Sequence, residues 1–171
     1  MDGKAVSEST VVLSHLMLPQ DANPTGNVHG GVIMKYIDNA AGVVSIRHSR
    51  TISVTASIDQ LDFYVPMYVG DLLILRASLN YVGRTSMEVG VRIEGENLLT
   101  GDVKHVASAY LTFVALFDEN ADVKMVPPLI LETQDQERRN EEARERRQAR
   151  LEMKQKKLEK KQLLKQDAER G

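Results

Sequence analysis

The stretch from Gly26 to Asp38, GNVHGGVIMKYID, joins a polar, glycine-containing segment to the start of an apolar run that holds one carboxylate. From residue 29 to about residue 48 the chain lacks turn signals, and apolar residues recur every three or four positions, at Ile33, Ile37, Ala40 and Val44. This spacing predicts a helix of about five turns that is apolar on most sides. The apolar surface of such a helix must be buried against other elements, so we expect the fold to be organised around it.

Segments with strand character flank this helix on both sides. Residues 9–18 are rich in β-branched and apolar types and stop at Pro19, which predicts a first strand. Four more strands are predicted after the helix, at residues 52–65, 72–82, 86–95 and 103–117. In the first of these the apolar alternation changes phase, which predicts a β-bulge near Asp59 and Gln60.

The order of these elements predicts an α+β domain, in which an antiparallel sheet wraps around one long apolar helix. Because so little of the helix is polar, a second subunit is a natural source of further cover, and we expect at least a dimer. Asp118-Glu119-Asn120 and Pro127-Pro128 close the domain, which we place at residues 1–131.

Residues 132–171 form a charged tail. The first 131 residues hold nine Lys and Arg against fourteen Asp and Glu, whereas the tail holds thirteen against ten. The tail has no glycine or proline before Gly171 and consists mainly of good helix formers, which predicts one long polar helix. Leu151 and Leu158 are followed by Lys165, so no coiled coil is predicted. We expect a solvated helix with internal Glu/Arg pairs; the alternative is a segment that docks on a subunit or an anionic ligand.

Composition excludes several classes of function. The chain has no cysteine, which removes disulfides, thiolate nucleophiles and thiolate metal ligands. It has no run of about 18 apolar residues and no signal-peptide pattern, so we expect a cytoplasmic protein that does not bind membranes. Interleaved acidic residues and the lack of aromatics in the tail argue against nucleic-acid binding.

His29 has no second metal-ligating residue at helical spacing, so no metal site is predicted. His48 lies at the helix end, where a cationic ring would suit the helix dipole.

Four segments carry a resemblance to a known family: MLPQDANPTGNVHGGVIMKYIDNAAG, DFYVPMYVGD, VGRTSMEV and ASAYLTFVALFDEN. Over roughly residues 8–128 the chain closely resembles the acyl-CoA thioester hydrolases of bacteria and of the cytosol. The resemblance implies a hotdog fold, hydrolysis of acyl-CoA to a free acid and CoA, and no cofactor apart from the CoA of substrate and product. It also implies homodimers or trimers of dimers, with active sites at the dimer interface.

The residues of the opening stretch permit that chemistry. Gly30 and Gly31 place backbone N–H groups without side chains at the helix start, where a thioester carbonyl would be polarised. Asp38 follows about two turns later, as a general base that activates water or as a nucleophile that forms a mixed anhydride. Asn27 is either the helix cap or an amide that orients water or thioester, and the resemblance implies that it acts with Asp38 of a partner subunit.

Other candidates are less specific. His29 is a structural or carbonyl-binding residue, or assists catalysis. Arg84, Thr85 and Ser86 form a basic, polar turn that either binds pantetheine amides and CoA phosphates or is a solvated hairpin. Since the domain is poor in cations, Arg138 and Arg139 of the tail are further candidates for the phosphates.

Two other functions are alternatives to hydrolysis. Asp21-Ala22-Asn23-Pro24 superficially fits the Asp-x-Asn-Pro pattern of hotdog-fold enoyl-CoA hydratases, but His29 comes three residues too late for that pattern. The second is a non-catalytic acyl-CoA-binding regulator. Release of thiol marks the hydrolase, loss of enoyl absorbance without thiol marks the hydratase, and saturable binding with neither marks the regulator.

Overall fold

A computed structural model describes residues 2–117 and 125–170 of the chain. In the described part the elements follow the expected order, with short additions at the N-terminus and after the last long strand. They are β1 (Lys4–Ala5), η1 (Val6–Glu8), β2 (Val11–Leu16), η2 (Pro19–Asp21), α1 (Gly30–Ser49), β3 (Ile52–Phe63), β4 (Asp71–Val82), β5 (Ser86–Asn97), β6 (Val103–Leu116), β7 (Leu129–Ile130) and α2 (Gln134–Arg170). The predicted closing turn at Asp118-Glu119-Asn120 lies outside the described residues.

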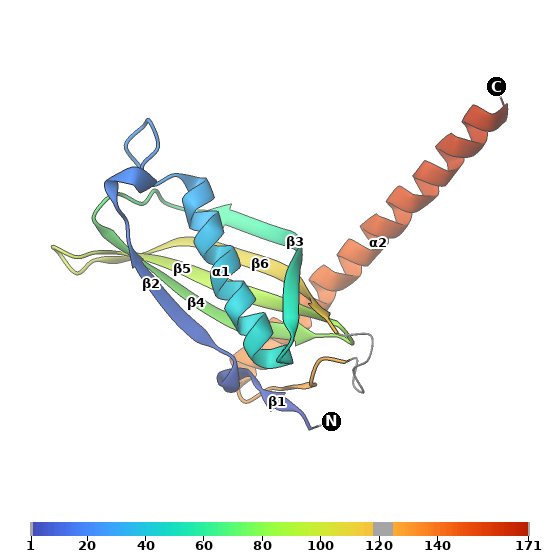
Figure 1. Cartoon of the computed structure of the whole chain (residues 1–171), viewed down its shortest axis with the longest axis horizontal. Helices are drawn as coiled ribbons and strands as arrows, with labels where there is room; N and C mark the ends of the chain where they lie inside the picture. Colours follow the sequence, from blue (N-terminus) through green and yellow to red (C-terminus); the bar gives the residue numbers. More distant parts are fainter. Residues whose placement is uncertain (1, 118–124, 171) are drawn as a thin grey trace.

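Five strands form one antiparallel sheet in the order β2-β4-β5-β6-β3, and α1 lies across one face of it (Figure 1). This is the predicted hotdog arrangement. Within the described residues β3 pairs with β6 alone, which makes it an edge strand. Its register shifts between Thr55 and Ser57 and again between Ile58 and Gln60, so the predicted bulge is confirmed and is double. The short strands β1 and β7 pair in parallel to each other.

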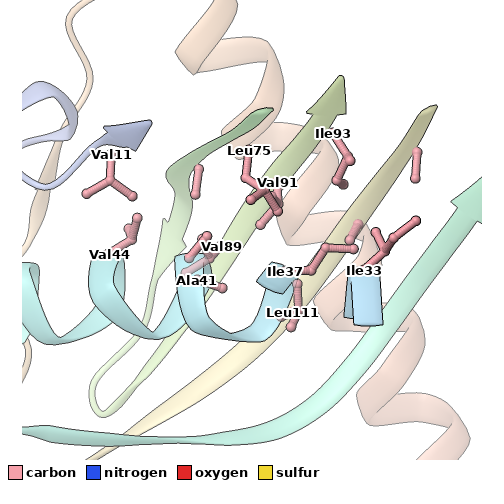
Figure 2. Packing of buried hydrophobic residues seen from close by; sticks show 14 of the residues in the cluster. Val11, Ile33, Ile37, Ala41, Val44, Leu75, Val89, Val91, Ile93 and Leu111 are labelled. Carbon is pink, nitrogen blue, oxygen red and sulfur yellow. The ribbon is translucent and has the colours of Figure 1, made fainter. Parts of the chain in front are cut away.

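The core lies between α1 and the sheet, because the apolar stripe of the helix faces the inward side chains of the central strands. Figure 2 shows four helix residues among the side chains of this cluster. They are Ile33, Ile37, Ala41 and Val44, and the labelled strand residues of the same cluster include Leu75, Val89, Val91, Ile93 and Leu111. Burial of each Ile, Leu or Val contributes about 1.5–3 kcal/mol relative to exposure, so this contact fixes α1 on the sheet.

The sheet covers only one side of α1 in a single chain. Met34, Val43 and Ile46 on the other side of the helix are exposed, and Ile52 at the start of β3 is 69% exposed. The edge of β3 also carries exposed Val54 and Ile58. Exposed apolar residues gathered on α1 and β3 indicate an interaction surface, in agreement with the predicted dimer, which stays a prediction.

The first half of α2 packs against the opposite face of the sheet from α1. Asn140 and Ala143 are buried there, and Asn140 Nδ2 donates to the backbone oxygen of Asn80 at 2.7 Å. The expectation of a solvated tail is therefore wrong for this half, because the outer face of the sheet offers buried partners that periodicity alone does not show. The predicted internal pairs are present, with Arg138 bound to Asp135 and Glu142.

Beyond the sheet, α2 continues as an exposed helix. Residues 151–162 are all exposed, as expected for this part of the tail. In Figure 1 this end of α2 projects away from the rest of the fold. Within the described ranges, no helix is both long and apolar enough to cross a membrane.

Candidate active site

The start of α1 is capped by His29. The ring Nδ1 of His29 accepts from the backbone N–H of Gly31 at 2.9 Å, and the His29 carbonyl accepts from Val32 and Ile33. The alternative that Asn27 is the N-cap is therefore wrong. A histidine replaces the usual Ser, Asp or Asn because its Nδ1 reaches the same orphan amide, and this requires an unprotonated Nδ1 in the structure.

This cap determines which backbone N–H groups at the start of α1 are free to bind a ligand. The N–H of Gly31 is occupied by His29, and a Cβ at Gly31 would lie only 3.0 Å from the ring Nδ1. The N–H of Gly30 has no acceptor among the described residues. Of the two donors predicted to bind a thioester carbonyl, Gly30 is thus available as the structure stands, and Gly31 becomes available when the His29 ring turns away.

A pocket of about 370 Å³ lies beside this helix start. Its wall is mainly apolar and includes two asparagines, Asn23 and Asn27. The lining residues are Asn23, Asn27, Val28, Gly30, Ile33, Phe63, Tyr64, Val65, Pro66 and Met67. An apolar cavity with few polar groups next to open backbone donors suits an acyl chain that ends in a polar carbonyl.

Asn23 is the pocket residue whose role the sequence analysis missed. Its Oδ1 accepts from the Thr25 N–H at 3.0 Å, from Thr25 Oγ1 at 2.7 Å and from the Asn27 N–H at 3.3 Å. These bonds fix the side chain, and the part of the chain described here offers no acceptor for its NH₂ group. Asn27, by contrast, forms a backbone bridge to Tyr68. The fixed turn around Asn23 therefore presents a hydrogen-bond donor at the pocket.

Asp38 lies half-buried on the side of α1 that faces β3. Its Oδ1 accepts from the hydroxyl of Thr55 at 2.6 Å. Thr55 was also missed by the sequence analysis, because a threonine in a strand carries no signal of its own. A hydroxyl donor orients the carboxylate without supplying a positive charge, so the second oxygen keeps its capacity to accept a proton.

Asp38 and the open amide are separated along α1. Eight residues from Gly30 to Asp38 correspond to about 12 Å of helix rise. One carbonyl bound at Gly30 therefore cannot contact Asp38 of the same chain. The structure brings Gly30, Gly31, His29 and Asn27 together at the helix start and places Asp38 elsewhere.

The turn Arg84-Thr85-Ser86 connects β4 to β5 at the other end of α1. The Arg84 carbonyl accepts from Val126 at 2.9 Å, and the adjoining Pro127 carbonyl contacts His48 in the last turn of α1. The 20-residue helix is about 30 Å long, so within one chain this turn is remote from Gly30. Arg84 itself is exposed.

His48 is buried, and burial lowers its pKa although its Nε2 lies 2.9 Å from the Pro127 carbonyl. A cationic ring would suit the helix dipole at this position, but burial outweighs the hydrogen bond to Pro127 and disfavours the charged form. Arg138 and Arg139, the tail candidates for phosphate binding, both pair with Asp135. In the described ranges, no group of three or more His, Cys, Asp or Glu side chains is placed to hold a metal ion.

Comparison with known proteins gives consistent matches. Residues 25–101 match the sequence model of the thioesterase superfamily. An uncharacterized acyl-CoA thioester hydrolase of Bacillus subtilis is 40% identical over 129 residues, which cover 75% of this chain and 74% of that protein. The cytosolic acyl coenzyme A thioester hydrolase of Mus musculus is 38% identical over 146 residues. That match covers 81% of this chain, and the chain spans only 38% of the length of the mouse protein.

Solved structures agree over nearly the whole chain. An apo-hexameric acyl-CoA thioesterase superposes with a TM-score of 0.83 at 37% identity, covering 90% of this chain and 97% of the other. An acyl-CoA hydrolase of Staphylococcus aureus, in complex with butyryl coenzyme A, coenzyme A and coenzyme A disulfide, gives a TM-score of 0.80 at 34% identity, covering 96% and 98%. The S. aureus protein has also been solved with an aspartate, an asparagine or a threonine replaced by alanine.

Proposed function

This chain belongs to the acyl-CoA thioester hydrolase family, and on that basis we propose that it hydrolyses acyl-CoA to a free carboxylic acid and coenzyme A. The observation that carries the proposal is the Asp38–Thr55 hydrogen bond of 2.6 Å, which holds a carboxylate in one orientation without neutralising it. The apolar pocket and the open Gly30 amide supply a place for the acyl group and its carbonyl.

The proposed reaction uses water as the nucleophile. The thioester carbonyl oxygen accepts from the Gly30 N–H at the positive end of the α1 dipole, which polarises the carbonyl carbon. Asp38 takes a proton from a water molecule as its oxygen attacks that carbon, while the Thr55 hydroxyl holds the carboxylate. The tetrahedral oxyanion remains on the Gly30 donor, then collapses and expels the CoA thiolate, which recovers the proton from Asp38. Direct attack by Asp38, with a mixed anhydride, is the second route.

We propose that each site combines two chains. The separation of about 12 Å along α1 argues that Asp38 of one chain serves the carbonyl bound at Gly30 of its partner. Antiparallel α1 helices across the exposed apolar margin of α1 and β3 would meet this requirement and would bring the Arg84 turn towards the partner's helix start. This supports a homodimer, alone or within a trimer of dimers, with Arg84, Thr85 and Ser86 contacting CoA. The hexameric relative supports the larger assembly.

The amide partner of Asp38 is better assigned to Asn23 than to Asn27. The asparagine, aspartate and threonine replaced in the S. aureus hydrolase are separated by 15 and then 17 residues. Asn23, Asp38 and Thr55 have the same separations and the same residue types. The fixed Asn23 side chain at the pocket supports this assignment. We also propose a cytoplasmic location, supported by the cytosolic mouse relative.

The test follows thiol release from acyl-CoA by purified wild type and variants. Asp38→Asn should lower kcat by at least about 100-fold, the scale of general-base catalysis. Asn23→Ala should lower activity strongly, and Asn27→Ala, its matched control, should do so much less. Near-normal thiol release by folded Asp38→Asn would refute the proposal; loss of enoyl absorbance without thiol would instead identify a hydratase, and binding with neither a regulator.

Mixed oligomers test the shared site. In an equal mixture of Asn23→Ala and Asp38→Asn chains, half of the dimers are mixed and each mixed dimer has one intact site. Activity should therefore return to about a quarter of the wild-type value. No recovery in verified mixed dimers would show that each site lies within one chain.

A further inference from the structure

Asp59 lies on β3, four residues after Thr55, on the face of the sheet that α2 covers. Its Oδ1 accepts from Ser57 Oγ at 2.7 Å, and its Oδ2 accepts from Thr112 Oγ1 at 2.6 Å. The guanidinium of Arg150, from α2, donates to both Asp59 Oδ2 and Thr112 Oγ1. This closed cluster is largely buried, with 12% of the Asp59 side chain and 28% of the Arg150 side chain exposed.

The cluster stabilises the segment of β3 in which the pairing with β6 is interrupted. As an edge strand, β3 has ladder bonds to β6 alone in the part of the chain that the structure describes, and its two register shifts fall immediately after Thr55 and at Asp59. Each shift interrupts pairing and lets the strand bend, so the ladder alone defines this segment poorly. Ser57 and Thr112, which are directly paired across the strands, both donate to Asp59 and tie the bulged segment to β6.

Thr55 presents its hydroxyl to the other face of the sheet. It pairs with Phe113 of the core and donates to Asp38 on α1. The position of its Oγ1 relative to Asp38 therefore depends on how the segment that follows it is held. Arg150 reaches this segment from α2.

We propose that Arg150 is a positioning residue for the Asp38–Thr55 pair. Arg150 on α2 binds Asp59 and so keeps the bulged segment of β3 in the register that directs the Thr55 hydroxyl towards Asp38. This inference rests on the proposed function, because it takes Asp38 as the group that acts on the thioester. It gives the first half of the charged tail a part in catalysis.

Arg146 provides a matched control one turn earlier on α2. Its Nη2 donates to Glu88 Oε1 at 2.7 Å, and its guanidinium lies 3.8 Å from the centre of the Tyr110 ring. These partners lie on β5 and β6, and Tyr110 is paired with Gln60 just after the second register shift. Among the described contacts Arg146 makes no hydrogen bond to Asp59 or Thr112, the two residues that Arg150 holds. Loss of either arginine loosens the docking of α2, but only loss of Arg150 frees the bulged segment.

The experiment measures kcat and KM for thiol release from acyl-CoA with the full-length protein. Arg150→Leu should lower kcat by about tenfold or more with KM within twofold, because an ångström-scale displacement of a reacting group costs on the order of 100-fold. Arg150→Lys should recover most of the loss, and Arg146→Leu should keep kcat within twofold. In a Thr55→Val background, Arg150→Leu should change kcat by less than twofold, because the contact through which it acts is already absent.

Asp59→Asn is the second variant, for use if Arg150→Leu fails to fold or assemble; it should reproduce the loss of kcat. A kcat within twofold of wild type in the folded Arg150 or Asp59 variant overturns the inference. So does an equal loss in Arg146→Leu, or a full additional loss in the Thr55→Val background. These results differ from failure of the proposed function, in which wild type itself releases no thiol and the inference falls with it.

Discussion

Arg146→Met removes one partner of the ion pair that anchors α2 to the sheet. Glu88 is 4% exposed and would keep a single described donor, Asn80 Nδ2 at 3.1 Å. Removal of one partner from a fully buried pair costs about 3–5 kcal/mol, but Arg146 is 21% exposed, so water reaches the site and we expect about 2–3 kcal/mol. Burial alone would lower the pKa of Arg146, yet the hydrogen bond and charge of Glu88 raise it, so a charged guanidinium is lost.

The loss should lower Tm by roughly 5–10 °C for a chain of this size. Thermal and urea unfolding of Arg146→Met, Glu88→Met and the double variant, at one protein concentration, form a double-mutant cycle. The double variant leaves neither charge buried and should be more stable than the sum of the single changes predicts, by at least about 1.5 kcal/mol. If the single effects add to within about 0.5 kcal/mol, the pair does not stabilise the docking of α2 and the reasoning is wrong.

Two further predictions concern pH and the tail. Because burial lowers the pKa of His48 below its ordinary value of 6.5, the unfolded chain binds a proton that the folded chain does not as pH falls through 6.5. The free energy of unfolding should therefore fall from pH 7.5 to pH 5.5, and His48→Gln should show a smaller fall in urea titrations; an unchanged slope would contradict the burial argument. Truncation after Glu152 removes the end of α2, in which residues 153–162 are exposed, and should change stability by less than about 0.5 kcal/mol. Truncation after Glu132 should destabilise the fold, since it strips Asn140, Ala143 and Arg146 from the sheet, and equal stability of the two truncated chains would refute that role.

Much of the fold could be read from local pattern. The apolar spacing along residues 29–48 predicted α1 to within a residue at each end, and the change of phase near Asp59 predicted a bulge that the register confirms. These features depend on side chains that are close in sequence. The docking of α2 could not be predicted in this way, because its hydrogen-bond partners on the sheet are 38 to 91 residues away and its own pattern is almost uniformly polar.

In the candidate site, too, some features could be predicted from the sequence and others are known only from the structure. Asp38, Gly30 and Gly31 stood out because a carboxylate and paired glycines are unusual in an apolar helix. The structure instead decided that His29 caps the helix, that Thr55 holds Asp38, and that Asn23 is fixed at the pocket. Threonine in a strand and asparagine in a turn are too common to signal a role, so only their contacts reveal it.

By itself, the sequence determined the order of the elements, the apolar helix at their centre and the residues suited to thioester chemistry, because these follow from composition and from periodicities of a few residues. Only the tertiary structure decided that Gly30 and Asp38 are too far apart to serve one carbonyl within a chain, and that Arg150 of the tail holds the strand behind Thr55. Distances between remote segments depend on how the elements pack, and packing is a property of the whole fold.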